Sequence, residues 1–357
     1  MDIDPSVRSS GMGGASNAVF WDHVTNHWGN PALLGYQHGL SYEYGTTKLV
    51  PTLADDVEFN TNVLKLGGGG LGFAFSGKPF GAGGVDLDYG ESEGTDPSGN
   101  PTGTFSSYER VDAWSFGISA ARTAESIAMM TGHDPQSWSR YGDVSFGMTG
   151  KHLEISLAPG FAGETDASDL GLLVRLSPTE FLPGMRDVVG LDLSYGWSDL
   201  SFSSDPVVFP TPPEEEVSEH ERRGYAGRIR FDWPDMTTTL GGPTWIWEGL
   251  RPLVSFGMAD DHARIGVESS RYETDSNGWE LTIANVFSLR GGHYQDLLGD
   301  IDGDTDGWGV GIPIGQIAGV RYDFARVPQA RDSDLGELER HSASAWVDVM
   351  RIWRSTR

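Results

Sequence analysis

The stretch that decides the fold reads Val189-Gly190-Leu191-Asp192-Leu193-Ser194-Tyr195-Gly196-Trp197. Its odd-numbered positions are apolar or aromatic, and its even-numbered positions are glycine, serine or aspartate. A period of two predicts a β-strand, because successive side chains of a strand point to opposite faces. The face that holds Asp192 is too small and too polar to fill a core between two packed sheets. The contrast favours a membrane barrel, which turns an apolar face to lipid and a polar face to the lumen.

The same alternation recurs along most of the 357 residues. Further examples are 71–76, 85–89, 114–119, 144–149, 153–157, 254–258, 308–314 and 320–324. The sequence therefore predicts an all-β fold, a transmembrane antiparallel β-barrel of about 14 strands. In each of these segments we expect the apolar positions to face lipid.

Composition excludes several other classes of protein. Hydrophobic residues make up 38% of the chain and the mean hydropathy is −0.32, and the runs of about 20 apolar residues that form transmembrane helices are absent. The net charge of −26 argues against a nucleic-acid partner, because nucleic-acid binding needs a basic surface. The absence of cysteine fits an exported protein without disulfides.

Some segments break the alternation. Residues 1–37 contain glycines and an Asn-Pro pair, which predict turns and a short helix ahead of the sheet. Residues 120–131 are rich in Ala, Met and Ile and predict a helix, whereas the Pro- and Glu-rich residues 203–223 predict an exposed loop. Met1 to Ser9 has no apolar core, so it predicts no signal peptide. The chain is then either a mature form with an added Met or a protein that is not exported.

Three stretches carry a resemblance to a known family. The first is Ser10-Gly11-Met12-Gly13-Gly14-Ala15, followed by Asn30-Pro31-Ala32. The second is the strand pair in residues 38–50 and 57–75, and the third is the hairpin region in residues 306–312 and 319–324. Together, and in this order, they resemble the FadL/PorV-like outer-membrane proteins, which are related to long-chain fatty-acid transporters.

The resemblance implies a barrel in the bacterial outer membrane, in contact with membrane lipid. Residues 1–37 would form a hatch segment inside the lumen, and residues 38–357 would form the barrel. The expected function is passive uptake of hydrophobic small molecules through a hatch-controlled lumen. The alternative is a non-transporting barrel that serves as a scaffold or partner in protein secretion or surface attachment. Neither function makes or breaks a bond, so we expect no enzymatic activity and no organic cofactor.

The same resemblance points to candidate site residues. The hatch residues would be Gly11, Gly13, Gly14, Asn30, Pro31 and Ala32. Apolar hatch residues, namely Phe20, Trp21 and Leu33, would contact the substrate. Charges on the polar strand face either pair across the lumen and fix the hatch, or offer arginines to a substrate carboxylate. Arg228 and Arg230 are the arginines that we select as substrate-binding residues.

Two further patterns carry possible chemistry. Asp302, Asp304, Asp306 and Gly307 match the first positions of a calcium loop, although Pro313 stands where such a loop needs Glu. The alternatives are an acidic hairpin turn and a weak calcium site. His152, Glu154 and Ser156 share one face of a strand but lack the motif of a serine hydrolase, so we expect a polar row that faces the lumen.

Overall fold

The computed structural model describes residues 4–21, 25–50, 53–54, 56–77, 84–95, 98, 100–133, 137–182, 184–185, 187–210, 216–233, 239, 241, 243–267, 270–296, 298, 300–330 and 336–348. Its strands are β1 (Gly39–Lys48), β2 (Glu58–Gly68), β3 (Leu71–Ser76), β4 (Val85–Thr95), β5 (Pro101–Ser119), β6 (Gly142–Ala158), β7 (Phe161–Leu176), β8 (Val189–Ser204), β9 (Glu219–Phe231), β10 (Val254–Val267), β11 (Ser270–Ile283), β12 (Phe287–Asp296), β13 (Ile301–Ile314), β14 (Ala318–Val327) and β15 (Leu338–Val347). The helices are α1 (Val7–Ser10), η1 (Pro31–Tyr36), α2 (Ala120–Met130), α3 (Trp138–Tyr141), η3 (Pro178–Phe181) and α5 (Thr244–Gly249).

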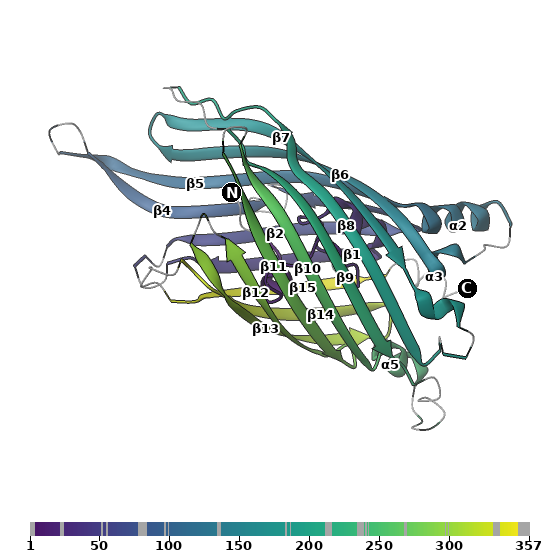
Figure 1. Cartoon of the computed structure of the whole chain (residues 1–357). Helices are drawn as coiled ribbons and strands as arrows, with labels where there is room; N and C mark the ends of the chain where they lie inside the picture. Colours follow the sequence, from purple (N-terminus) through teal and green to yellow (C-terminus); the bar gives the residue numbers. More distant parts are fainter. Residues whose placement is uncertain are drawn as a thin grey trace.

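These strands close into an antiparallel barrel, which confirms the predicted fold. β1 pairs with both β2 and β15, so the sheet has no free edge there. β3 and β4 both lie between β2 and β5, so the described sheet of 15 strands forms a wall with 14 positions. One end of the barrel, which we call the helical end, carries α2, α3, α5, the start of β1 and the end of β15 (Figure 1). The loop end is the opposite end.

An apolar belt surrounds the outside of this wall. Lipid-facing positions such as Leu66, Trp114, Met258, Ile312 and Val320 are all more than half exposed on the isolated chain. A closed barrel with an outward apolar belt is the architecture of bacterial outer-membrane proteins, because lipid covers the apolar side chains and closure leaves no backbone group unpaired. The belt therefore places the barrel across an outer membrane.

Toward the loop end the apolar residues move from the outer face of the wall to the inner face, and the polar residues move from the inner face to the outer face. On β6, Phe146 and Met148 are exposed on the outside, but nearer the loop end Leu153 and Ile155 point into the lumen and His152 points outward. The expectation that the apolar residues of 85–89 and 153–157 face lipid is wrong for this reason. Beyond the lipid the outer face meets water, so polar residues occupy it and apolar residues pack inside.

The third position of the wall is interrupted. Ser76 at the end of β3 lies opposite Ala113 of β5, and Val85 at the start of β4 lies opposite Val111. Only Asp112 separates the two partner residues on β5. The chain between Ser76 and Val85 is therefore inserted at one point of the wall, while the neighbouring strands continue past it.

The predicted helix is confirmed as α2, which begins after Ser119. The Ser119 hydroxyl accepts a hydrogen bond from the Arg122 backbone N–H and so caps the first turn. The predicted loop 203–223 is shorter than expected, because β9 already starts at Glu219 and pairs with β8. No helix in the described residues is long and apolar enough to cross a membrane.

Candidate functional site

The N-terminal residues 4–21 and 25–37, here called the plug segment, lie inside the barrel (Figure 1). The plug segment is bonded to the wall on several sides. The Asn17 amide donates to the Gly196 carbonyl on β8 at 3.1 Å, and the Ser16 backbone N–H donates to Asp261 on β10 at 2.8 Å. The Asn30 amide reaches the Leu172 carbonyl on β7 at 3.0 Å. These hydrogen bonds attach the plug segment to three strands of the wall.

Glycines of the wall allow this packing. A Cβ atom on Gly72 or Gly147 would collide with the backbone of Leu34 or Pro31 in the plug segment. The same holds around the barrel for wall glycines on other strands, namely Gly67, Gly117, Gly196, Gly278 and Gly292. A Cβ on Gly171 would collide with the Asn30 side chain. The small inner face seen in the sequence is therefore a seat for the plug backbone.

Asn30, Pro31 and Ala32 form the start of η1. The Asn30 side chain accepts a hydrogen bond from the Ala32 backbone N–H at 3.0 Å, and Pro31 occupies the first helical position, where its missing N–H costs nothing. Asn30 also donates to the Asn17 carbonyl at 3.0 Å. The motif thus joins two parts of the plug segment to each other and to the wall.

Gly11, Gly13 and Gly14 form the turn that follows α1. Gly13 and Gly14 have φ values of 69° and 85°, which side chains rarely tolerate. The Gly13 N–H donates to the Thr305 hydroxyl on β13 at 2.9 Å. A Cβ on Gly13 would also collide with the backbone of His293, so the turn packs directly on the wall.

Phe20, Trp21 and Leu33 belong to the packed interior of the plug segment, and each is at most 8% exposed. The Arg228 guanidinium lies 5.4 Å from the Trp21 ring centroid. Among the described residues, none of these four lines either of the two cavities described below. Their predicted contact with substrate remains a prediction.

Tyr36 lies in the same packed region. Its hydroxyl donates to the Asp143 carboxylate at 3.0 Å, and the Arg122 guanidinium lies 4.6 Å from its ring centroid. Burial, with the Asp143 charge next in importance, raises the pKa of Tyr36. The hydroxyl therefore stays protonated and keeps η1 attached to β6.

Arg228 and Arg230 share one counter-ion. Asp192 contacts Arg228 at 3.2 Å and Arg230 at 3.1 Å, and it accepts a hydrogen bond from the Ser177 hydroxyl at 2.7 Å. Asp192 is almost fully buried. This arrangement corresponds to the alternative in which charges of the inner face pair with one another.

A second charged network holds the beginning of the plug segment. Arg8 of α1 contacts Glu280 on β11 at 2.6 Å. Glu280 also contacts Arg290 at 2.7 Å, and Arg290 contacts Asp323 at 2.7 Å. Because Arg8 is the member from the plug segment, this network ties α1 to three strands of the wall.

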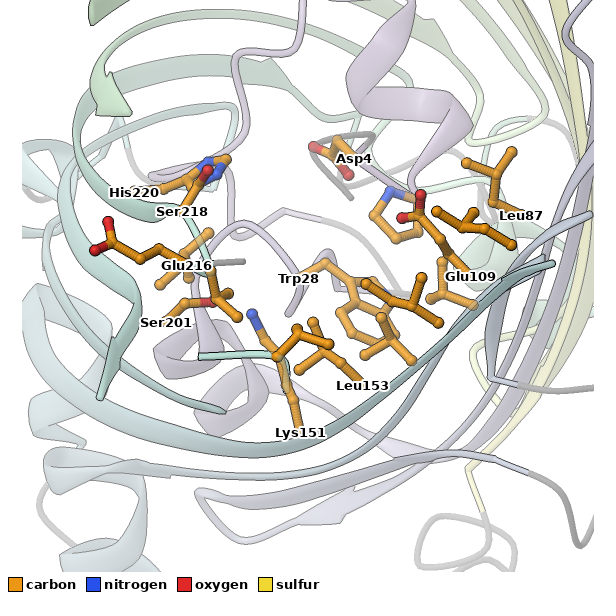
Figure 2. Close-up of a pocket in the computed structure, with 18 of the residues that line it drawn as sticks. Asp4, Trp28, Leu87, Glu109, Lys151, Leu153, Ser201, Glu216, Ser218 and His220 are labelled. Atoms are coloured by element: carbon orange, nitrogen blue, oxygen red, sulfur yellow. The ribbon is translucent and has the colours of Figure 1, made fainter. Parts of the chain in front are cut away.

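The larger cavity lies between the plug segment and the loop end. Its volume is about 470 Å³, and Figure 2 shows residues that line it. Its apolar wall comes from β4, β5 and β6 and consists of Val85, Leu87, Val111, Leu153, Ile155 and Leu157. Trp28 of the plug segment forms part of the floor, and Val207 and Glu216–Ser218 of the β8–β9 connection form part of the opposite side.

A smaller cavity of 250 Å³ adjoins it on the side of β10–β15. Asp4, His220 and Arg222 line both cavities and so stand between them. Arg222 donates to the Gly14 carbonyl at 3.1 Å and to Asp261 at 3.1 Å. Arg222 thus belongs to the boundary between the cavities and also holds the plug segment.

Sequence reasoning missed this cavity, although the sequence contains a signal for it. Along β6 the apolar positions move from even numbers at Phe146 and Met148 to odd numbers at Leu153 and Ile155. A change of parity within one strand moves the apolar residues to the other face. Here it marks where the wall leaves the lipid and an apolar lumen begins.

The predicted calcium loop is not a loop in the structure. Asp302, Asp304 and Asp306 lie along β13, with Asp302 and Asp304 each 3.0 Å from His293. Alternate residues of a strand are about 7 Å apart, so three such carboxylates do not converge on one ion. In the described part of the chain no group of three or more histidine and acidic side chains is placed to hold a metal ion. Calcium binding itself remains a prediction.

His152 and Glu154 also differ from expectation. Both side chains face outward. Their sequence neighbours Lys151 and Leu153 line the cavity, and successive side chains of a strand point to opposite faces. His152 contacts Asp166 of β7 at 2.9 Å on the outer surface. The polar row therefore belongs to the water-exposed outer face near the loop end.

The sequence matches no protein-family model and no curated protein. Several solved structures are similar to it over most of their length at low sequence identity. A Pseudomonas aeruginosa FadL homologue is 9% identical, with a TM-score of 0.42 over 96% of this chain and 98% of that chain. The Ralstonia pickettii toluene transporter TbuX is 11% identical, with a TM-score of 0.42 over 94% and 96%. The deltaS2S3 mutant of the monoaromatic hydrocarbon channel TodX is 11% identical, with a TM-score of 0.42 over 95% and 97%.

Proposed function

We propose that this barrel takes up hydrophobic small molecules passively across a bacterial outer membrane. The observation that carries the proposal is the apolar inner wall of β4, β5 and β6, which lines a cavity of 470 Å³. A lumen that only conducts water and ions is polar. An apolar concave surface of this size is instead typical of a binding site for a hydrophobic ligand.

The route that we propose turns sideways in the wall. The plug segment blocks the lumen toward the helical end, where its backbone packs on the wall glycines. Val85 and Leu87 line the cavity and directly follow the interruption between Ser76 and Val85. A molecule in the cavity therefore lies next to the one position of the described wall where a strand stops and restarts.

In this proposal the plug segment acts as the hatch. Gly11, Gly13, Gly14, Asn30, Pro31 and Ala32 hold it against the wall. Phe20, Trp21, Leu33, Arg228 and Arg230 would meet a substrate only after the plug segment moves, because they are packed within it or paired with Asp192. The process needs no cofactor, since no bond is made or broken.

Uptake of an uncharged dye tests the proposal. Intact bacteria that lack their own hydrophobic-uptake barrel are given N-phenyl-1-naphthylamine, which fluoresces once it reaches lipid. We expect the barrel to raise the initial rate, and Leu153→Trp, which narrows the cavity, to lower that rate toward the rate of the host. Val310→Trp on the lipid-facing side is the matched control and should retain uptake. A wild-type rate equal to that of the host contradicts the proposal.

The alternative, a non-transporting scaffold for secretion or surface attachment, is favoured by a different observation. At the helical end Ile127, Met130, Trp138 and Phe181 are more than half exposed on α2, α3 and η3. Exposed apolar groups of this kind fit a protein partner. Two results together would support this function: a dye-uptake rate that is the same with and without the barrel, and release of surface proteins when the barrel is deleted.

A further inference from the structure

We infer that the larger cavity recognises a neutral oxygen atom on its hydrophobic ligand, and that Lys151 and Ser201 together bind this oxygen. The ligands are ketones and alcohols with a long apolar part. The inference rests on the proposed function, because it names the substrate class of the same cavity. It also assigns a binding role to two residues of the lining.

One carboxylate brings the two residues together. The Lys151 ammonium lies 2.6 Å from Oδ1 of Asp169, and the Ser201 backbone N–H donates a hydrogen bond to the same oxygen at 2.8 Å. Asp169 is almost fully buried in the wall behind them. Lys151 and Ser201 both line the larger cavity, and Figure 2 shows the Lys151 nitrogen beside Ser201. Lys151 on β6 and Ser201 on β8 therefore present their polar groups at one place.

An irregularity in β8 turns Ser201 toward the cavity. The register between β7 and β8 shifts between Ser168 and Leu170, and Ser201 has a φ of 59°. Leu200 and Ser201 both line the cavity, although successive residues of a regular strand point to opposite faces. The strand thus departs from its alternation at the residue that adds a hydroxyl to the lining.

Both residues retain hydrogen-bonding capacity. An ammonium group has three N–H donors, and Asp169 is the only hydrogen-bond or ion-pair partner of Lys151 in the described part of the chain. Among the same described residues, the Ser201 hydroxyl has no hydrogen-bond partner. A ligand oxygen can accept hydrogen bonds from both groups. A hydrocarbon that displaces water from them leaves the donors unpaired, and this loss weakens its binding.

An apolar stripe continues from Lys151 along the same face of β6. Leu153, Ile155 and Leu157 follow at every second position and line the cavity. Alternate residues of a strand are about 7 Å apart, so the stripe extends about 20 Å from Lys151 toward the loop end. A ligand with its oxygen near one end of an alkyl chain matches this arrangement, because the oxygen reaches Lys151 while the chain lies on the stripe.

A carboxylate on the ligand does not suit this position. Asp169 already balances the charge of Lys151. A second carboxylate at Lys151 would lie close to the buried Asp169, and like charges repel more strongly in a partly enclosed site than in water. The pair of Lys151 and Asp169 therefore favours a neutral acceptor over an anion.

Three probes with the same number of carbon atoms test the inference. Decane, decan-2-one and decanoate, each in radiolabelled form, are equilibrated with the full-length barrel in lipid nanodiscs and with nanodiscs that contain no protein. The quantity compared is the enrichment, which is the amount of probe bound by the barrel relative to the amount dissolved in the same quantity of lipid. We expect the enrichment of decan-2-one to exceed that of decane and that of decanoate on the order of tenfold.

Paired substitutions remove the ammonium donor without leaving a buried charge unpaired. Lys151→Met with Asp169→Asn should lower the enrichment of decan-2-one on the order of tenfold and leave that of decane unchanged. Lys151→Gln with Asp169→Asn provides an amide donor and should restore part of the enrichment. Ser201→Ala should lower it by a smaller factor. Arg264→Met with Glu273→Gln removes an exposed ion pair from the outer face and should affect neither probe.

The outcomes are distinct. A higher enrichment of decan-2-one that falls in the Lys151→Met pair and in Ser201→Ala, with decane unchanged, supports the inference. A preference for decan-2-one that both variants retain overturns the role of these two residues. Enrichment of decane or decanoate at least equal to that of decan-2-one in the unaltered barrel overturns the inference without any variant, while uptake of hydrophobic molecules would stand. Enrichment of no probe overturns the proposed function together with the inference.

Discussion

The amide oxygen of Asn30 occupies the space that a Cβ atom on Gly171 would fill. Asn30 belongs to the plug segment and Gly171 to β7. The Asn30 side chain therefore fits in this position only because residue 171 of the wall has no side chain. The same close approach recurs between other wall glycines and the plug backbone. The position of the plug segment is therefore specified jointly by its own residues and by glycines distributed over the barrel.

Replacing Gly171 by Ala should displace Asn30 and loosen the plug segment. The expected result is faster hydrogen exchange of the backbone N–H groups of residues 30–37, because the caps of η1 depend on Asn30. Gly311→Ala is the matched control, since its Cβ would lie at an ordinary 3.5 Å from its nearest neighbour. Equal exchange in the two variants would show that the wall glycines do not seat the plug.

Removing Asp192 should destabilise the barrel strongly. Asp192→Ala leaves Arg228 and Arg230 without their counter-ion, and loss of one partner of a buried pair costs about 3–5 kcal/mol. Asp304→Ala, at an exposed position of β13, should change the free energy of unfolding by less than about 0.5 kcal/mol. Urea unfolding in lipid vesicles measures both values, and a similar cost for the two variants would refute the role assigned to Asp192.

Arg8→Gln should release α1 from the wall without damaging the wall itself. Glu280 keeps its contact with Arg290 in this variant, so the melting temperature should change little. Dye uptake should rise, because the plug segment is held less firmly. Arg326→Gln, which removes an exposed pair with Glu339, serves as the control. Unchanged uptake with Arg8→Gln would show that α1 does not limit passage.

The position of the lipid boundary along the barrel can be tested on one strand. Met258 and His262 both face outward on β10, but only Met258 lies in the apolar belt. Met258→Arg should cost about 2–4 kcal/mol of unfolding free energy in a bilayer, and His262→Arg about 0–1 kcal/mol. Equal costs would contradict the proposed position of the lipid boundary between these residues.

The alternation around Asp192 was sufficient to predict the barrel, because strand period and face content are local properties of the sequence. The helix at residues 120–130 was predictable for the same reason. The prediction that Asp302, Asp304 and Asp306 lie in a loop was wrong, because they lie on β13. Their spacing is also the spacing of residues on one face of a strand. Pairing with β12 and β14 decides between the two, and pairing is not visible in a local pattern.

The cavity was missed because we assumed that apolar residues face outward along the whole strand. That rule holds at Phe146, within the belt, and fails at Leu153, beyond it. The position of Trp28 depends on how the plug segment folds against several distant strands, so no local pattern predicts it. The ion pair between Arg222 and Asp261 joins β9 to β10, so it likewise depends on strand pairing and not on a local pattern.

The central claim is that hydrophobic molecules occupy the cavity above the plug segment, and cysteine protection tests it most directly. The chain has no cysteine, so Leu153→Cys in the cavity and His152→Cys on the outer face each provide a single reactive thiol on adjacent residues. The rate of alkylation by a small maleimide is measured with and without dodecan-1-ol. We predict that dodecan-1-ol slows alkylation at position 153 and leaves position 152 unchanged. Equal rates at position 153 with and without the ligand would contradict the account.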